Sequence, residues 1–180
     1  MEEQQLEQPS LLKAIMNYGA ILGIAQVIVS LFIFALGKGV FEIESSIHVF
    51  LTISVISLGI RNYRDNQLEG SISYWKSVKM ATLIAFFGSV VLGFAYYIYV
   101  KFVDASIIVA VLDQTEKTMV AKQYPADQIS IGMHYSRKFA PFILFLVSII
   151  KYTLMGLLFA LVFSLFVKKK KETDMDHSNS

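Results

Sequence analysis

The chain contains four long stretches that are almost free of charged residues, and these constrain its fold more than any other feature. They cover residues 14–37, 45–63, 80–100 and 143–167. A helix rises about 1.5 Å per residue, so about 20 residues cross a hydrocarbon core about 30 Å thick. Backbone groups in lipid need internal hydrogen bonds, which helices supply. The sequence therefore predicts an all-α polytopic membrane protein with four transmembrane helices in a bundle.

Composition agrees with a membrane protein. Hydrophobic residues make up 55% of the chain and charged residues 17%, whereas soluble domains carry about 25% charge. There is no cysteine, which excludes disulfides, thiolate nucleophiles and cysteine-ligated metals. We expect one membrane domain over residues 13–171, between a cytoplasmic tail at 1–12 and a disordered tail at 172–180.

Basic residues predict the orientation, because Lys and Arg accumulate on the cytoplasmic side of a membrane. The connection between the second and third stretches and the end of the fourth stretch hold eight of the sixteen Lys and Arg residues. We therefore expect both termini in the cytoplasm. The same eight residues are candidates for contact with anionic lipid headgroups, although ordinary positive-inside placement explains them as well: Arg61, Arg64, Lys76, Lys79, Lys168, Lys169, Lys170 and Lys171.

Small residues recur every four positions in three of the stretches and predict close helix contacts. Residues four apart share a helix face, and small side chains let helices approach closely in lipid. The candidates are Gly19, Gly23, Ala81, Ala85, Ser89, Gly93, Gly156, Ala160 and Ser164. They fit packing within one chain or an interface between copies. Leu83 and Leu158, by contrast, are expected to face lipid.

The connection at residues 101–138 is the only sizeable segment outside the predicted spans, and it lies on the periplasmic side. Ala105–Leu112 is apolar, and Tyr124-Pro125-Ala126-Asp127 is typical of a helix start. We expect two helices that meet at a bend near Tyr124-Pro125. An amphipathic segment on the membrane surface and a partner-binding or gating lid are both compatible with this pattern.

Few polar residues lie within the stretches, and they do not form a known catalytic motif. Gln26 is the deepest amide, and the other buried polar candidates are Asn17, Ser54, Ser57 and Ser89. His48 lies four residues after Glu44, which places both on one helix face. Lys151 is the one charge in the fourth stretch, where its long side chain is expected to reach the outer interface. No enzyme activity, metal site or cofactor is expected.

Three sequence runs carry a resemblance to a known family. They are Arg61-Asn62-Tyr63-Arg64-Asp65, Glu69-Gly70-Ser71-Ile72-Ser73-Tyr74-Trp75-Lys76, and Tyr99-Val100-Lys101-Phe102-Val103-Asp104. With Tyr18–Gly23 and the lysine-ended last stretch, they resemble the DUF4199 family, small integral membrane proteins of Bacteroidota with unknown function. The resemblance spans about residues 12–171. It implies four helices and a bacterial inner-membrane location, and it transfers no catalytic residue.

Two classes of function remain open from the sequence. The first is a non-catalytic membrane component that assembles with itself or with other envelope proteins. The alternative is a subunit of a small oligomeric transporter or channel. In both cases the expected partners are membrane lipids, with no role for nucleic acid.

Overall fold

The computed structural model describes residues 2–35 and 44–167, and its regular structure there is entirely helical. Its five helices are α1 (Glu2–Ala35), α2 (Glu44–Gln67), α3 (Tyr74–Phe102), α4 (Ser106–Ala121) and α5 (Ala126–Val167). The predicted all-α class is confirmed for these residues.

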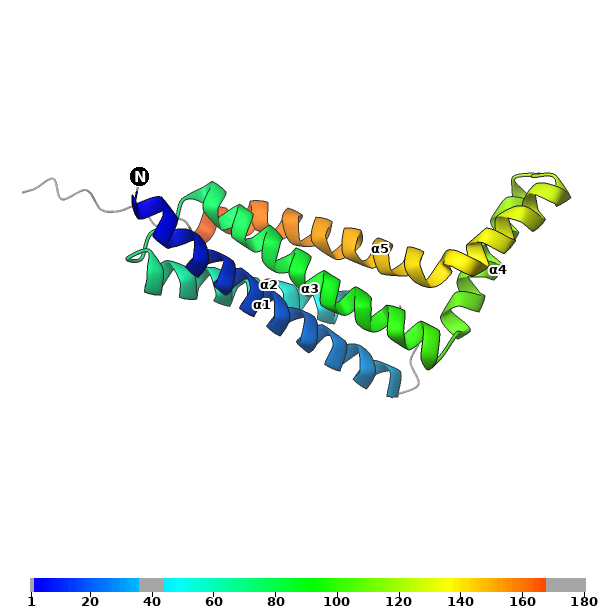
Figure 1. The fold of residues 1–180 in the computed structure, drawn as a ribbon, viewed down its shortest axis with the longest axis horizontal. Helices are drawn as coiled ribbons and strands as arrows, with labels where there is room; N and C mark the ends of the chain where they lie inside the picture. The colour runs from blue at the N-terminus through cyan, green and yellow to red at the C-terminus, as the bar shows by residue number, and fades with distance from the viewer. Residues whose placement is uncertain (1, 36–43, 168–180) are drawn as a thin grey trace, which may run out of the picture.

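Helices α1, α2, α3 and the part of α5 from residue 141 onward pack side by side, and we call this unit the helical body (Figure 1). α1 and α3 run in one direction, whereas α2 and α5 run in the other. α3 contacts every other helix. The core consists of apolar side chains such as Leu22, Ile60, Met80, Ile84 and Leu92, each at most 1% exposed.

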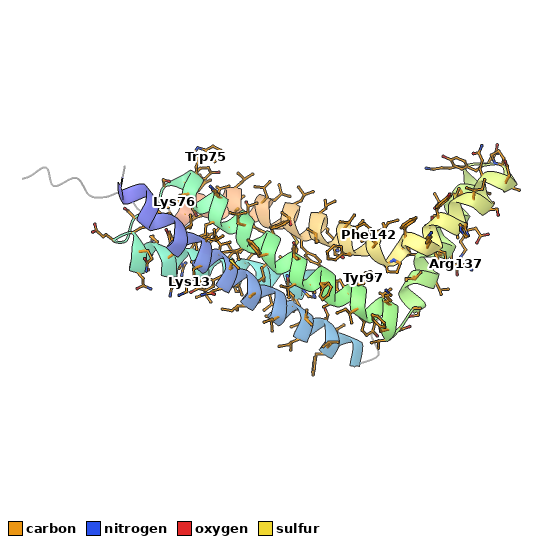
Figure 2. All side chains as sticks on the ribbon, in the orientation of Figure 1. Lys13, Trp75, Lys76, Tyr97, Arg137 and Phe142 are labelled. Atoms are coloured by element: carbon orange, nitrogen blue, oxygen red, sulfur yellow. The ribbon has the colours of Figure 1, made fainter. Side chains whose placement is uncertain are left out.

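The ends of α1 and α3 lie at one end of the body, next to α4, and we call it the hairpin end (Figure 1). The start of α2 points toward this end, since His48 Nε2 lies 3.2 Å from Ser30 Oγ of α1. The start of α3 and the end of α5 lie at the opposite end. Figure 2 shows Tyr97 near the hairpin end, and Trp75 and Lys76 at the opposite end.

Helix α4 and residues 126–140 of α5 form a helical hairpin that projects from the body (Figure 1). The carboxylate of Asp104 accepts hydrogen bonds from the backbone N–H of Ser106 (2.8 Å) and from its hydroxyl (2.9 Å), which fixes the start of α4. Gln123, with φ 58°, ends the helix. The turn between α4 and α5 therefore falls at the bend expected from Tyr124-Pro125.

The structure differs from the sequence prediction at the last span, because the second half of the predicted connection and the span form one helix. Residues 101–138 and 143–167 were predicted as separate segments, but α5 is one helix of 42 residues. Pro141 lies inside it. Proline removes one helical hydrogen bond and bends a helix, and α5 changes direction between Arg137 and Phe142 (Figure 2). A proline can thus bend a helix without ending it.

Three of the described helices are long and apolar enough to cross a membrane: Leu11–Ile33, Tyr74–Phe102 and Ala126–Phe166. α2 does not meet this measure, because Arg61, Arg64 and Asp65 lie in its last turns. α1 also begins at Glu2, so the segment predicted as a tail at 1–12 is helical from that residue.

Candidate functional site

Small residues hold α3 against α5 in an antiparallel register. The hydroxyl of Ser164 donates to that of Ser77 (2.9 Å), and the hydroxyls of Ser89 and Thr153 lie 3.1 Å apart. Between these two bonds, Gly156 lies so close to Ala85 that a Cβ on the glycine would collide with the Cβ of the alanine. The two hydrogen bonds thus bracket a contact for which glycine is required.

A second close contact joins α1 to a different face of α3. A Cβ on Gly19 would lie 2.5 Å from the Cβ of Phe87, and one on Gly23 would lie 2.5 Å from the Cβ of Val91. Gly88 receives the side chain of Leu22. The sequence pattern missed Gly88, because a four-residue repeat from Ala81 identifies only the face that meets α5.

All nine small residues predicted to mediate helix packing are buried within this chain, in α1, α3 and α5. Helix contacts of the chain itself therefore cover Gly19, Gly23, Ala81, Ala85, Ser89, Gly93, Gly156, Ala160 and Ser164. The expectation for Leu83 was wrong, because this side chain is partly buried against the core. Leu158 is 66% exposed.

A buried polar network links α1, α2 and α3 toward the hairpin end. Gln26 Nε2 donates to Thr52 Oγ1 (3.1 Å), and Ser30 Oγ lies 3.2 Å from His48 Nε2. The Tyr96 hydroxyl lies 3.1 Å from Ser30 Oγ. Gln26, His48 and Thr52 are each at most 1% exposed. The network thus unites two of the predicted polar candidates, Gln26 and His48, with three residues that were not predicted as polar candidates: Ser30, Thr52 and Tyr96.

The helical spacing of polar residues could have identified Ser30 and Thr52 from the sequence. Ser30 follows Gln26 by four positions, and Thr52 follows His48 by four, so each pair shares a helix face. The other polar candidates lie elsewhere. Asn17 is exposed, Ser54 and Ser57 are partly buried, and Ser89 bonds with α5.

The hydrogen bonds of Thr52 fix the orientation of the Gln26 amide. Thr52 donates its single hydroxyl proton to the backbone carbonyl of His48 (2.7 Å). Its oxygen must therefore accept from Gln26, which turns the amide nitrogen toward Thr52. Among the described residues, the buried Gln26 Oε1 has no hydrogen-bond partner. A buried acceptor without a hydrogen-bond donor lowers the stability of the folded protein by about 1–3 kcal/mol. A donor such as water beside Gln26 Oε1 would therefore be stabilising.

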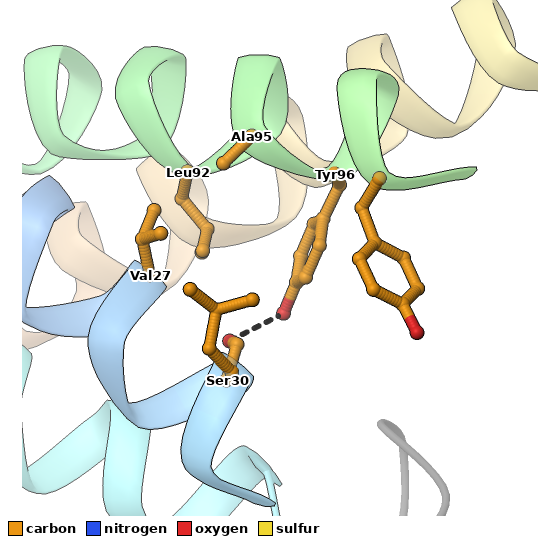
Figure 3. A pocket seen from close by; sticks show the side chains of 7 residues that line it. Val27, Ser30, Leu92, Ala95 and Tyr96 are labelled. Atoms are coloured by element: carbon orange, nitrogen blue, oxygen red, sulfur yellow. Dashed lines mark hydrogen bonds between the residues drawn. The ribbon is translucent and has the colours of Figure 1, made fainter. Parts of the chain in front are cut away.

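A small pocket of about 30 Å³ adjoins this network between α1 and α3. Figure 3 shows Ser30 and Tyr96 hydrogen-bonded at its wall, with Val27, Leu92 and Ala95 beside them. A water molecule needs at least about 10–15 Å³. The pocket thus has room for one or two waters against a mostly apolar lining.

Lys151, the third predicted polar candidate, lies near the network but outside it. Its side chain is exposed, and Nζ lies 5.2 Å from the centre of the Tyr152 ring. That ring in turn lies 5.8 Å from the ring of His48. Lys151 and His48 are thus both neighbours of the Tyr152 ring.

Four of the eight basic residues predicted to contact lipid headgroups lie in the described part of the chain, at the end opposite the hairpin: Arg61, Arg64, Lys76 and Lys79. Arg61 and Lys79 are exposed, and Lys76 Nζ lies 5.7 Å from the centre of the Tyr63 ring. Arg64 forms an ion pair with Asp65 (2.7 Å), and this hydrogen bond raises the pKa of the Arg64 guanidinium. Lys168–Lys171 and the tail at 172–180 lie outside the described residues, as does the side chain of Glu44.

No group of three His, Asp or Glu side chains within residues 2–35 and 44–167 is placed to hold a metal ion.

The helices define the class of this protein: it is all-α, with long apolar helices consistent with a membrane protein. The family described as protein of unknown function (DUF4199) matches residues 17–169, and the chain belongs to this family. No curated protein and no solved structure matches the chain.

Proposed function

We propose that the chain is a multi-pass protein of a bacterial inner membrane that crosses the bilayer four times, with both termini in the cytoplasm. Three helices have the required length and composition. α2 packs against α1, α3 and α5, so the neighbouring helices bury its polar side chains His48 and Thr52. The basic end of α2 lies at the proposed cytoplasmic side. Large apolar side chains stay exposed on the outside of the body, including Ile28, Phe50, Phe94 and Leu158, as a lipid-facing surface requires.

Within that membrane the protein acts as a non-catalytic component that assembles with itself or with other envelope proteins. The observation that carries this proposal is the projecting hairpin. Among the described helices, α4 contacts α5 and α3 only, so much of its surface is not covered by them. The small-residue faces, by contrast, are already occupied within the chain. An assembly would therefore use the outer faces of the helices.

Native mass spectrometry after purification in a mild detergent tests this function. The expected result is a stable complex, either of several copies or of this chain with a second envelope protein at fixed stoichiometry. A matched pair of variants locates the contact: Val120→Glu alters an exposed apolar position of the hairpin, and Leu158→Glu alters one of the body. A monomer at all concentrations, with lipids as the only companions, would contradict the assembly proposal.

A transporter or channel subunit is the second candidate, and the buried network favours it. Gln26, Ser30, His48, Thr52 and Tyr96 place polar groups from three helices together near the hairpin end. The test is ion or solute flux into vesicles that contain the purified chain. Loss of flux in Gln26→Met, with unchanged flux in the exposed-site variant Asn17→Met, would support it. An absence of flux in the wild-type chain would remove this alternative.

A further inference from the structure

A continuous apolar stripe runs along α5 through both the hairpin and the body. Its residues recur every three or four positions, and each side chain is at least 36% exposed: Ile131, Tyr135, Phe139, Phe142, Leu146, Ile150, Leu154, Leu158, Leu161 and Leu165. The stripe thus continues past Pro141 without a polar interruption.

The stripe is too long to cross a membrane directly. From Ile131 to Leu165 it measures about 51 Å at 1.5 Å per residue, whereas a hydrocarbon core is about 30 Å thick. About two fifths of the stripe must therefore lie elsewhere. The hairpin carries most of this excess, with Ile131, Tyr135 and Phe139.

The two hairpin helices meet at Gly132 of α5, where a Cβ would lie 2.9 Å from Met119 Cε of α4. Both helices expose polar and apolar side chains. α4 exposes Asp113, Glu116 and Lys117 and also Val109 and Val120, and α5 exposes Arg137 and Lys138 beside the stripe. Ile131 and Tyr135 lie beside the Gly132 contact and are 58% and 57% exposed. The apolar face that continues the stripe of the body is therefore the one on α5.

Aromatic and basic side chains occur together where the hairpin meets the body. The rings of Tyr135 and Phe139 are stacked with centres 6.5 Å apart, and Lys138 Nζ lies 5.7 Å from the centre of the Phe139 ring. On α3, Lys101 Nζ lies 5.4 Å from the centres of the Tyr97 and Phe102 rings. Such side chains are enriched at headgroup level, where their apolar parts lie in lipid and their polar ends in water.

The direction of the hairpin suits a position along the membrane surface. In Figure 1 the hairpin leaves the line of the body and rises on the side of α5 that is opposite α3. It therefore extends over the area beside the body, which lipid occupies if the body spans the bilayer.

We propose that the hairpin lies in the headgroup region of the outer leaflet, with the Ile131, Tyr135 and Phe139 face of α5 in lipid and α4 in water. The occupant of this face is the lipid surface, because the face continues the lipid-facing stripe of the body. This inference rests on the proposed membrane orientation. It gives the hairpin the role of a surface anchor that sets the depth and tilt of the body.

Single-cysteine labelling tests the proposal directly, because the natural chain has no cysteine. Ile131→Cys and Tyr135→Cys carry an environment-sensitive fluorophore on the apolar face. Ser130→Cys and Lys117→Cys are matched controls at exposed positions of the same hairpin. Leu154→Cys reports on the body. The full chain is placed in vesicles of phosphatidylethanolamine and phosphatidylglycerol that also contain brominated phosphatidylcholine.

We expect the brominated lipid to quench the labels at positions 131 and 135, and aqueous iodide to quench those at 130 and 117. Iodide quenching of all four labels would overturn the inference and place the hairpin in water. Protection of positions 131 and 135 from both quenchers, with crosslinking between copies, would assign the face to a second chain instead. A label at position 154 that lipid does not quench would contradict the proposed spanning body rather than the hairpin.

Discussion

At the scale of single residues, the available space decides which substitutions the helices accept. Gly156 and Gly132 both lie in α5, but they meet different neighbours. A Cβ at position 156 would collide with the Cβ of Ala85, which is fixed to the backbone of α3. A Cβ at position 132 would meet the end of the flexible Met119 side chain.

We predict that Gly156→Ala destabilises the protein and that Gly132→Ala does not. Alanine favours a helix over glycine by about 1 kcal/mol, so a loss of stability must come from overpacking, which costs about 1–3 kcal/mol. Thermal unfolding in detergent measures both variants. A higher unfolding temperature for Gly156→Ala would mean that α3 and α5 are less closely packed than described.

In the proposed membrane orientation, Lys151 lies close enough to the outer interface for its charge to reach the headgroups. Thr153 is hydrogen-bonded to Ser89, and this register places Lys151 about 10 Å along the helix axis from the level of Tyr97. A lysine side chain reaches toward an interface at this distance. Its exposed ammonium also lies near the Tyr152 ring.

We therefore predict that Lys151→Met leaves membrane insertion and thermal stability nearly unchanged. Lys151→Glu should be less stable, because its shorter side chain reaches the headgroups poorly and loses the contact of the cation with Tyr152. Unfolding temperatures and the fraction inserted give the comparison. A loss of flux or of complex formation in Lys151→Met, with the fold intact, would instead assign this lysine to a functional site.

At the scale of elements, α5 combines a spanning segment with half of the hairpin, and Pro141 lies between them. Proline lacks the N–H that would bond to the Arg137 carbonyl, and its ring presses against that carbonyl. Pro141 is therefore expected to contribute to the angle between hairpin and body. The contacts of the body are elsewhere, at Ser77, Ala85 and Ser89 of α3.

We predict that Pro141→Ala changes the direction of the hairpin and leaves the body intact. Distances between spin labels at Val120→Cys and Phe94→Cys report the direction, since both positions are exposed and lie on either side of the bend. A label pair within the body, at Leu58→Cys and Phe94→Cys, is the control. Unchanged distances in both pairs would mean that contacts between α4 and α3 set the angle.

At the scale of the whole molecule, orientation follows from the distribution of charge between the two ends. Arg61, Arg64 and Lys79 lie at the end opposite the hairpin, and such residues accumulate on the cytoplasmic side. An impermeant maleimide added to intact cells should label Val120→Cys, and it should label Asp65→Cys only after the membrane is opened. Labelling of Asp65→Cys in intact cells, with Val120→Cys protected, would invert the topology.

The sequence by itself determined the helical class, the membership of the family and the helix turn at Tyr124-Pro125. These depend on local properties, since apolar length and turn-forming residues act within a few positions of the chain. It also singled out nine small residues as candidates for helix packing, because glycine, alanine and serine at four-residue intervals mark one face of a helix. These nine positions are buried in the structure.

Only the tertiary structure decided which faces meet. It placed Gly88 against Leu22, joined Gln26 and Ser30 to His48 and Thr52, and buried part of Leu83. It also showed that α5 is one helix that runs through Pro141, whereas the sequence predicted a separate connection and span on the two sides of this residue. Such outcomes depend on the relative rotation and depth of neighbouring helices. The hydropathy of a segment and the spacing of its residues do not report the rotation or depth of a helix, because both are the same whichever neighbour the helix meets.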